Sequence, residues 1–309
     1  MGAASIRSRD SILAMGSFRP LGSQETHPMR FASTTCDRTV SNRCGHRAGH
    51  AIRGFSMIEL AVSLIIIAIL LGSILVPLNS QVESRKYDET QRALERAREA
   101  LLGYAAAYGY FPCPASATSN GQEAGANHAT GACAVGLIGT TTFVGFLPAA
   151  TLGLTATDSQ GFAVDGWGLL QNRIRYAIYR DSALTSFLVR TNGMRSTGMG
   201  TIASTPMLYV CNSGTGVTPG TNCGTAVTLT SNALVVIWSV GPNSTTSGGS
   251  SVHEQQNPNP SANPQTPDRI FVSQTKAGAP GDANEFDDVV TWISPPTLFN
   301  RMIAAGQLP

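Results

Sequence analysis

The sequence lacks the residue patterns that mark the common classes of enzyme. It has no Gly-x-Ser-x-Gly elbow, no glycine-rich phosphate loop ending in Lys-Ser or Lys-Thr, and no His-Glu-x-x-His zinc motif. Histidine, the most common general base, occurs only 5 times in 309 residues. Asp287 and Asp288 are adjacent, so in a strand their side chains would point to opposite faces, which does not suit paired acid–base catalysis. These absences favour a non-enzymatic protein.

Two other classes of site are disfavoured in the same way. No Cys-x-x-Cys pair occurs, and His128 and His253 stand in polar stretches without the spacing of zinc ligands. No basic run interleaved with aromatic residues is present, as a nucleic-acid surface would need. We therefore expect neither a zinc site nor binding to nucleic acid.

The most informative segment that is present is an apolar run over residues 55–78. Its 24 residues contain a single charged side chain, that of Glu59. As a helix rising about 1.5 Å per residue it would span roughly 36 Å, against about 30 Å of hydrocarbon in a bilayer. The run has no polar face, is longer than the core of a secretory signal, and is not followed by a small-x-small cleavage site. We therefore prefer a membrane-spanning helix over a buried soluble helix or a signal peptide.

The start of this run resembles the processing site of type IV pilins and type II secretion pseudopilins. Gly54 is followed by Phe55, Glu59 stands at the fifth position after the glycine, and the hydrophobic helix continues behind it. The resemblance implies that a prepilin peptidase cuts after Gly54 and methylates the new amino terminus at Phe55. It also implies that Glu59 pairs with the terminal amine of a neighbouring subunit during filament assembly.

Cleavage after Gly54 would make residues 1–54 a leader and change the charge of the remaining chain. The leader holds 8 of the 21 basic and 3 of the 19 acidic residues, which leaves 13 and 16 and a net charge of −3. Arg47 and Arg53 precede the apolar run, so the leader is expected in the cytoplasm and the bulk of the chain in the periplasm, anchored by one pass in the bacterial inner membrane. A start at Met29 would give a leader of 26 residues, which is more usual for the resembling proteins.

Cysteine usage agrees with this topology. Two of the six cysteines precede the cut, and the other four are Cys113, Cys133, Cys211 and Cys223. Four cysteines allow three pairings, and disulfides persist outside the cytoplasm. We favour Cys113 with Cys133 and Cys211 with Cys223, because each pair would close a short loop rich in Gly, Asn and Thr. Free thiols are the alternative.

Residues 79–110 are expected to continue the helix in amphipathic form. Apolar and aromatic side chains recur every seven residues, with two more on the same face and charged residues elsewhere: Tyr87, Leu94, Leu101 and Tyr108, then Ala97 and Tyr104. Such a stripe is typical of a helix that packs on a globular domain. The helix should end near Gly109, before a stretch with two prolines breaks the period.

Residues 111–309 are expected to form an α+β head. Runs of β-branched and aromatic residues predict strands separated by turns at Arg175–Tyr179, 207–211, 226–230, 233–240, 270–273 and Val289–Ile293. Residues 144–148 are expected to form a turn or short helix, and residues 297–305 a final helix with Ser294 as its N-cap. Local antiparallel pairing would give a sheet that covers the stripe of the long helix.

Two places in the head resemble the major pseudopilin family. Asp165-Gly-Trp-Gly, followed by Arg175-Tyr176, resembles an Asp-x-Trp-Gly segment and strand of that family. A core aromatic at Trp167 and an Asx turn at Asp165 would be a purely structural interpretation of the same residues.

The second resemblance concerns the ends of a loop that binds calcium in that family. It implies Asn243, Asp287 and Asp288 as candidate calcium ligands, since calcium takes six to eight oxygen ligands. The stretch between them, 244–284, is long and rich in Pro, Asn and Ser, which favours an extended excursion over a compact cage. A solvated acidic turn is the alternative.

Together these patterns predict a structural subunit, a pseudopilin of a type II secretion system. It would assemble with other pilin or pseudopilin subunits on an inner-membrane assembly platform into a periplasmic filament for protein secretion. The alternatives are a minor pilin of a type IV pilus or DNA-uptake system, and a filament-tip binding or adhesin subunit that uses the 244–284 insertion. A membrane-tethered enzyme would require a deep pocket lined by convergent polar groups.

Overall fold

The structure is a computed structural model that describes most of the chain after the proposed cut. The described ranges are 54–134, 137–138, 142–181, 185–243, 251–258, 268–279 and 281–308, and within them the side chains of 73–79, 137–138 and 171 are not described. The chain divides into two units, Met1–Ser56 and Met57–Pro309, and the second contains the head. Apart from Gly54, the leader predicted at 1–54 lies outside the described residues.

Helix α1, Met57–Tyr108, is the longest element of the fold. The large apolar side chains of its first half, from Met57 to Leu71, are exposed. Among the residues whose side chains are described, no helix is both long and apolar enough to cross a membrane. The spanning run predicted at 55–78 includes 73–79, whose side chains lie outside the described residues. The helix ends where Gly109 takes a left-handed φ of 80°, at the position predicted.

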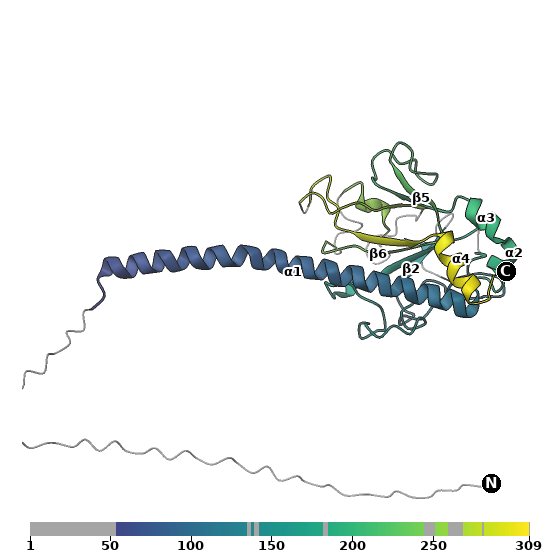
Figure 1. The fold of residues 1–309 in the computed structure, drawn as a ribbon, viewed down its shortest axis with the longest axis horizontal. Helices are drawn as coiled ribbons and strands as arrows, with labels where there is room; N and C mark the ends of the chain where they lie inside the picture. Colours follow the sequence, from purple (N-terminus) through teal and green to yellow (C-terminus); the bar gives the residue numbers. More distant parts are fainter. Residues whose placement is uncertain are drawn as a thin grey trace, which may run out of the picture. The chain divides into compact units, whose positions relative to one another are not determined.

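The second half of α1 lies along the head and supplies part of its core (Figure 1). Leu94, Ala97 and Leu101 are buried, as the seven-residue stripe predicted, and Leu102 joins them. For the last position of the stripe the prediction was wrong, because Tyr108 is 57% exposed. An α-helix has 3.6 residues per turn, so a seven-residue repeat drifts off a straight buried face within a few turns.

The α1 stripe packs on a five-stranded antiparallel sheet. Its order is β1–β2–β3–β6–β8, and α1 contacts β6 and β8. The strands are β1 (Leu137–Ile138), β2 (Thr142–Phe146), β3 (Arg175–Tyr179), β6 (Val235–Ser239) and β8 (Val289–Ile293). The β3 and β6 side chains are buried along their whole length, as expected for central strands covered on both faces.

Strand β2 corrects the prediction of a turn or short helix at 144–148. Its Gly145 is required by packing, since a Cβ there would lie 2.5 Å from the carbonyl oxygen of Ala115. Ala115 and Phe146 exchange backbone hydrogen bonds of 2.8 and 2.9 Å. Gly145 makes this strand hard to recognise in the sequence. A glycine is needed at this position because the backbone of Ala115 lies against it.

A second sheet of three strands, β5–β4–β7, completes the head. Its members are β4 (Leu208–Cys211), β5 (Thr228–Ala233) and β7 (Ile270–Val272). The β4–β5 pair is antiparallel, but β4 and β7 are parallel, which corrects the expectation of local antiparallel pairing throughout. Parallel neighbours need a long connection, and the chain between β4 and β7 provides one. The α+β class predicted from the sequence is confirmed.

Short elements and two disulfides complete the described part of the head. The elements are α2 (Gly193–Thr197), α3 (Met199–Ser204), α4 (Pro295–Ala304), and the 3-10 turns η1 (Leu170–Asn172) and η2 (Glu254–Gln256). Helix α4 lies beside the end of α1 (Figure 1). Ser294 takes the N-cap position, but its hydroxyl lies 3.1 Å from the Thr297 hydroxyl and does not cap the backbone. Cys113 pairs with Cys133 and Cys211 with Cys223, the pairing favoured from the sequence.

The packing of α1 predicts a large cost for shortening its buried stripe. Leu101→Ala removes a fully buried side chain and leaves a cavity, so we expect the free energy of unfolding to fall by about 2–5 kcal/mol. Chemical denaturation of the detergent-solubilised full-length chain measures this. Leu229→Ala, at a position that is 45% exposed, is the matched control and should change stability little. Equal effects of the two substitutions would contradict this packing.

Candidate functional site

The three residues of the predicted processing site are accessible. Phe55 is 78% exposed, and Glu59 is an exposed acidic residue in the first turn of α1. The Ser63 hydroxyl donates a hydrogen bond of 2.7 Å to the backbone carbonyl of Glu59. A Cβ at Gly54 would meet no atom within 4 Å, so the described fold does not itself require glycine there.

A second candidate site is a buried cluster of carboxylates at the start of β8. Glu254, Asp287 and Asp288 are all buried, and each offers a carboxylate oxygen within 4.8 Å of the others. Asp287 and Asp288 precede β8 and are not part of it, so the alternation of a regular strand does not separate their side chains. The structure therefore corrects the expectation that the two aspartates face apart.

Asn243, the third residue predicted for this site, also lies at the cluster. Its amide nitrogen donates hydrogen bonds of 3.1 Å to Glu254 and 3.2 Å to Glu285. Through its nitrogen, Asn243 thus bridges two carboxylates of the cluster. The cluster contains all three predicted residues and adds Glu254. Glu285, which belongs to the same acidic stretch of the sequence as Asp287 and Asp288, lies beside it.

The segment that carries Glu254 folds back onto the head. Glu254 accepts a hydrogen bond of 2.9 Å from the backbone nitrogen of Asp287. Asn257 donates 2.7 Å to Asp288 and 3.0 Å to the Val272 carbonyl, which ties the segment to β7. For residues 251–258 this corrects the expectation of an extended excursion.

The electrostatics of the cluster are unfavourable without a cation. Burial, and then repulsion by Glu254 and Glu285, raise the pKa of Asp287 to about 8. Burial also raises the pKa of Asp288 well above its ordinary value, although Asn257 and Arg175 oppose this. One carboxylate oxygen of Asp287, Oδ1, is buried without a hydrogen-bond partner among the described residues.

The donor set fits a hard divalent cation such as calcium. Calcium binds carboxylate and carbonyl oxygens, and a bound cation would supply the missing partner of Asp287 Oδ1 and relieve the mutual repulsion. The sequence alone did not reveal Glu254, because it is one of three acidic residues in the 244–284 insertion, with Asp268 and Asp282. Its spacing does not distinguish it from these two, and only the fold brings it to Asp287.

The Asp165 motif holds its own loop in a fixed conformation and attaches that loop to α1. Asp165 Oδ1 accepts a hydrogen bond of 2.9 Å from the Trp167 nitrogen, which is an Asx turn. Gly166 donates 3.0 Å to the Thr90 hydroxyl, and a Cβ on Gly166 would lie 2.2 Å from the Lys86 carbonyl. The motif therefore docks its loop on α1. Trp167 is half-buried against Tyr87 and is not a core residue.

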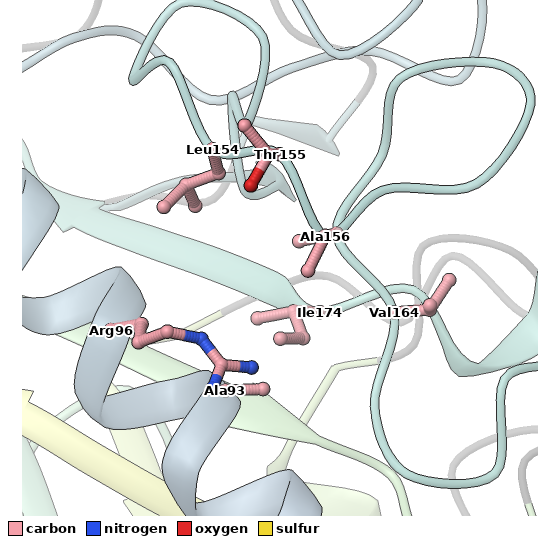
Figure 2. Close-up of a pocket in the computed structure, with 8 residues that line it drawn as sticks. Ala93, Arg96, Leu154, Thr155, Ala156, Val164 and Ile174 are labelled. Atoms are coloured by element: carbon pink, nitrogen blue, oxygen red, sulfur yellow. The ribbon is translucent and has the colours of Figure 1, made fainter.

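A small cavity of about 70 Å³ lies elsewhere along α1. In Figure 2 the Arg96 side chain extends from α1 beside Ala93 toward Ile174, opposite Leu154 and Thr155. Arg96 is the one titratable side chain among the residues described as lining the cavity. The cavity therefore does not bring together the convergent polar groups of an active site.

The raised pKa values predict how stability changes with pH in a chelator. Asp287 is protonated in the folded chain up to a pH of about 8 but only to about 4 when unfolded, so its favourable contribution is full at low pH and is lost as pH rises through that window. We expect the free energy of unfolding to fall across the window, by at most about 1.4 kcal/mol per pH unit for one group, and the melting temperature to fall with it. Asp287→Asn should flatten the slope, and Asp88→Asn, exposed on α1, should not. Stability that rises over this range would contradict the assignment.

Comparison with known proteins identifies the amino-terminal segment. A family model described as the prokaryotic N-terminal methylation motif matches residues 50–75. No curated protein and no solved structure matches the chain. The match covers Gly54, Phe55 and Glu59 together with most of the apolar run. The chain therefore carries the N-terminal methylation motif, which is the signature of type IV pilins and pseudopilins.

Proposed function

We propose that the protein is a structural subunit of a filament in the bacterial envelope, matured by a prepilin peptidase. The observation that carries this proposal is the methylation motif at residues 50–75, which supports a type IV pilin-like protein. Gly54 is exposed, and a Cβ there would meet no atom of the described residues within 4 Å, which agrees with a role in recognition by the peptidase. Cleavage would free Phe55 as the methylated amino terminus.

The apolar run would hold the subunit in the inner membrane before assembly. The motif supports membrane anchoring, and Glu59 is the one formal charge over residues 55–78. Two disulfides in the head agree with an oxidising compartment such as the periplasm. Leaving the bilayer for a filament would exchange contacts with lipid for contacts with the apolar halves of neighbouring α1 helices.

Glu59 would set the register between subunits. A carboxylate among apolar side chains is costly unless it is paired, and the protonated amine of Phe55 on a neighbouring subunit is a suitable partner. Attraction between two charges about 4 Å apart is stronger in a dry interface than in water, so a mismatched register would be disfavoured. Exposure of Glu59 leaves its carboxylate accessible to such a neighbour.

Within this class we favour a pseudopilin of a type II secretion system. The Asp165 loop and the acidic cluster at β8 support that choice, because both resemble the major pseudopilin pattern. A minor pilin or a tip adhesin would carry the same amino-terminal motif. Copy number in purified filaments separates these roles, since a major structural subunit would be abundant and a tip subunit would be present once or a few times.

We also propose that Glu254, Asp287 and Asp288 bind calcium, with Asn243 orienting the carboxylates. Their burial, the unpartnered Asp287 Oδ1 and the raised pKa values of the cluster support this assignment. Bound calcium would supply positive charge, and the chain would supply the fixed oxygens around it. Because Glu254 belongs to the insertion, binding would fasten residues 251–258 to the start of β8.

The role of Glu59 is tested by substitution. Glu59→Ala should leave cleavage after Gly54 largely intact but reduce filament incorporation about tenfold or more, the effect of losing about 1.4 kcal/mol or more of pairing. Mass spectrometry of the amino terminus reports cleavage and methylation, and quantification of sheared filaments reports assembly. Ser63→Ala, one helical turn further along, is the control. Normal incorporation of Glu59→Ala would refute the electrostatic account.

Calcium binding is tested by thermal unfolding in calcium and in chelator. At calcium about 100-fold above its dissociation constant, stabilisation should reach about 2.7 kcal/mol and raise the melting temperature by roughly 5–10 °C. Glu254→Gln should remove most of this shift, whereas Asp88→Asn should retain it. An equal shift in both variants, or no shift in the unsubstituted chain, would overturn the site.

A further inference from the structure

A turn after β6 joins the Asp165 motif to the acidic cluster. Ser239, the last residue of β6, donates a hydrogen bond from its hydroxyl to the Asp165 carboxylate and accepts one of 3.2 Å from the Gly241 nitrogen. The Asn172 amide donates hydrogen bonds of 2.9 Å to Asp165 and 2.6 Å to the Gly241 carbonyl. All four bonds are buried. The backbone of Gly241 is therefore held to the Asp165 motif at both its nitrogen and its carbonyl.

Gly241 lies directly against Asp287 of the cluster. Its backbone has a left-handed φ of 65°, and a Cβ there would lie 2.7 Å from the Asp287 carbonyl oxygen and closer still to the carboxylate oxygen Oδ1. That Oδ1 is the buried oxygen without a hydrogen-bond partner among the described residues. A side chain at position 241 would have to displace the Asp287 carboxylate. The position of Asp287 Oδ1 therefore depends on a glycine at this turn.

Helix α1 contacts the same aspartate through Tyr87. The Tyr87 hydroxyl donates a hydrogen bond of 3.3 Å to the Asp287 carbonyl, and its ring packs edge-on against Trp167 with centroids 5.0 Å apart. Trp167 belongs to the Asp165 motif. Tyr87 precedes Leu94 in the helix, where the buried apolar side chains of α1 begin among the described residues, so this contact lies at the end of the head nearer to the apolar run. One side chain of α1 therefore reaches both the cluster and the motif.

These contacts form a closed ring. It runs from α1 to the acidic cluster, from the cluster through the Gly241 turn to the Asp165 motif, and from the motif back to α1. Arg175 on β3 adds a second link between the motif and the cluster, since its side chain is fully buried. Burial lowers the pKa of Arg175 to about 10, and attraction of its charge by Asp288 and Asp165 opposes this shift. A displacement of the cluster would therefore disturb the attachment of the head to α1, and the reverse holds as well.

We propose that Tyr87 and Gly241 position Asp287 for a cation, so that cation binding and the attachment of the head to α1 strengthen each other. The proposal rests on the calcium site proposed above. A cation that fixes the Asp287 carboxylate would also restrain its carbonyl, to which Tyr87 donates, and the Gly241 turn packed against both oxygens. Such coupling is reciprocal, because each event changes the free energy of the other by the same amount. Bound calcium would thus regulate how firmly the head is held to α1 next to the apolar run.

The coupling through Tyr87 is tested with the detergent-solubilised full-length chain. Isothermal titration calorimetry measures the dissociation constant for calcium. Tyr87→Phe removes one hydroxyl and keeps the ring, so we expect the dissociation constant to rise about two- to tenfold, the factor for one hydrogen bond. Tyr108→Phe, at an exposed position of the same helix, is the matched control and should leave the constant unchanged.

The role of Gly241 is tested by the same measurement. Gly241→Ala should raise the dissociation constant about tenfold or more, because its Cβ would displace Asp287 Oδ1. Gly220→Ala is the matched control, since Gly220 also has a left-handed φ, of 71°, but a Cβ there would meet no atom within 4 Å. Should Gly241→Ala fail to fold, Ser239→Ala removes the hydroxyl that holds the turn and should raise the constant about two- to tenfold.

Hydrogen exchange distinguishes positioning from a general loss of stability. In the unsubstituted chain calcium should slow exchange of the Gly166 and Trp167 amides about fivefold or more, although neither residue is part of the cluster. Glu254→Gln, which removes a carboxylate of the cluster, should abolish this slowing. Tyr87→Phe should reduce it even at saturating calcium, whereas a variant that only weakens calcium binding would regain it.

The outcomes separate the coupling from the calcium site itself. An unsubstituted chain that binds no calcium would overturn the site and the coupling together. Calcium binding with an unchanged dissociation constant in Tyr87→Phe, and in Gly241→Ala or Ser239→Ala, would overturn the coupling and leave the site intact. Unchanged exchange at Gly166 and Trp167 on addition of calcium would have the same meaning.

Discussion

Burial of the second half of α1 is the constraint on which the head depends. Leu94, Ala97 and Leu101 are inaccessible to solvent, and the sheet strands β6 and β8 cover them. Without this helix, the face of the sheet that packs on α1 would be exposed to solvent. The second half of α1 is therefore part of the core of the head. The same helix begins with exposed apolar side chains. One continuous element therefore joins a half that is buried in the head to a half whose apolar side chains are exposed, and we propose lipid or neighbouring subunits as the contacts of that second half.

Several parts of the head are attached to α1 by direct contacts. The Asp165 loop docks on it through Gly166 and Trp167, and Tyr87 reaches from it to the backbone of Asp287. The hydrogen bond from Tyr87 thus connects the acidic cluster at β8 to the helix. A cation in the cluster would stabilise the end of the head that lies nearest the apolar run.

The buried carboxylates lower the stability of the fold, but their oxygens suit the binding of a cation. Placing Glu254, Asp287 and Asp288 together costs folding free energy, because buried like charges repel and one oxygen of Asp287 has no partner among the described residues. Such an arrangement is favourable only when a proton or a cation compensates it. The three residues come from segments far apart in the sequence, so this cost becomes visible only in the folded chain.

The sequence by itself determined the local features of this protein. The processing motif around Gly54, the helical period up to Gly109, and strands β3 and β8 were all predictable, because each depends on neighbouring residues and a repeating pattern. Tertiary structure alone decided the parallel pairing of β7, the strand at Gly145 and the position of Glu254 beside Asp287. These depend on contacts between distant segments, whose free energy comes from burial and desolvation that no local pattern records.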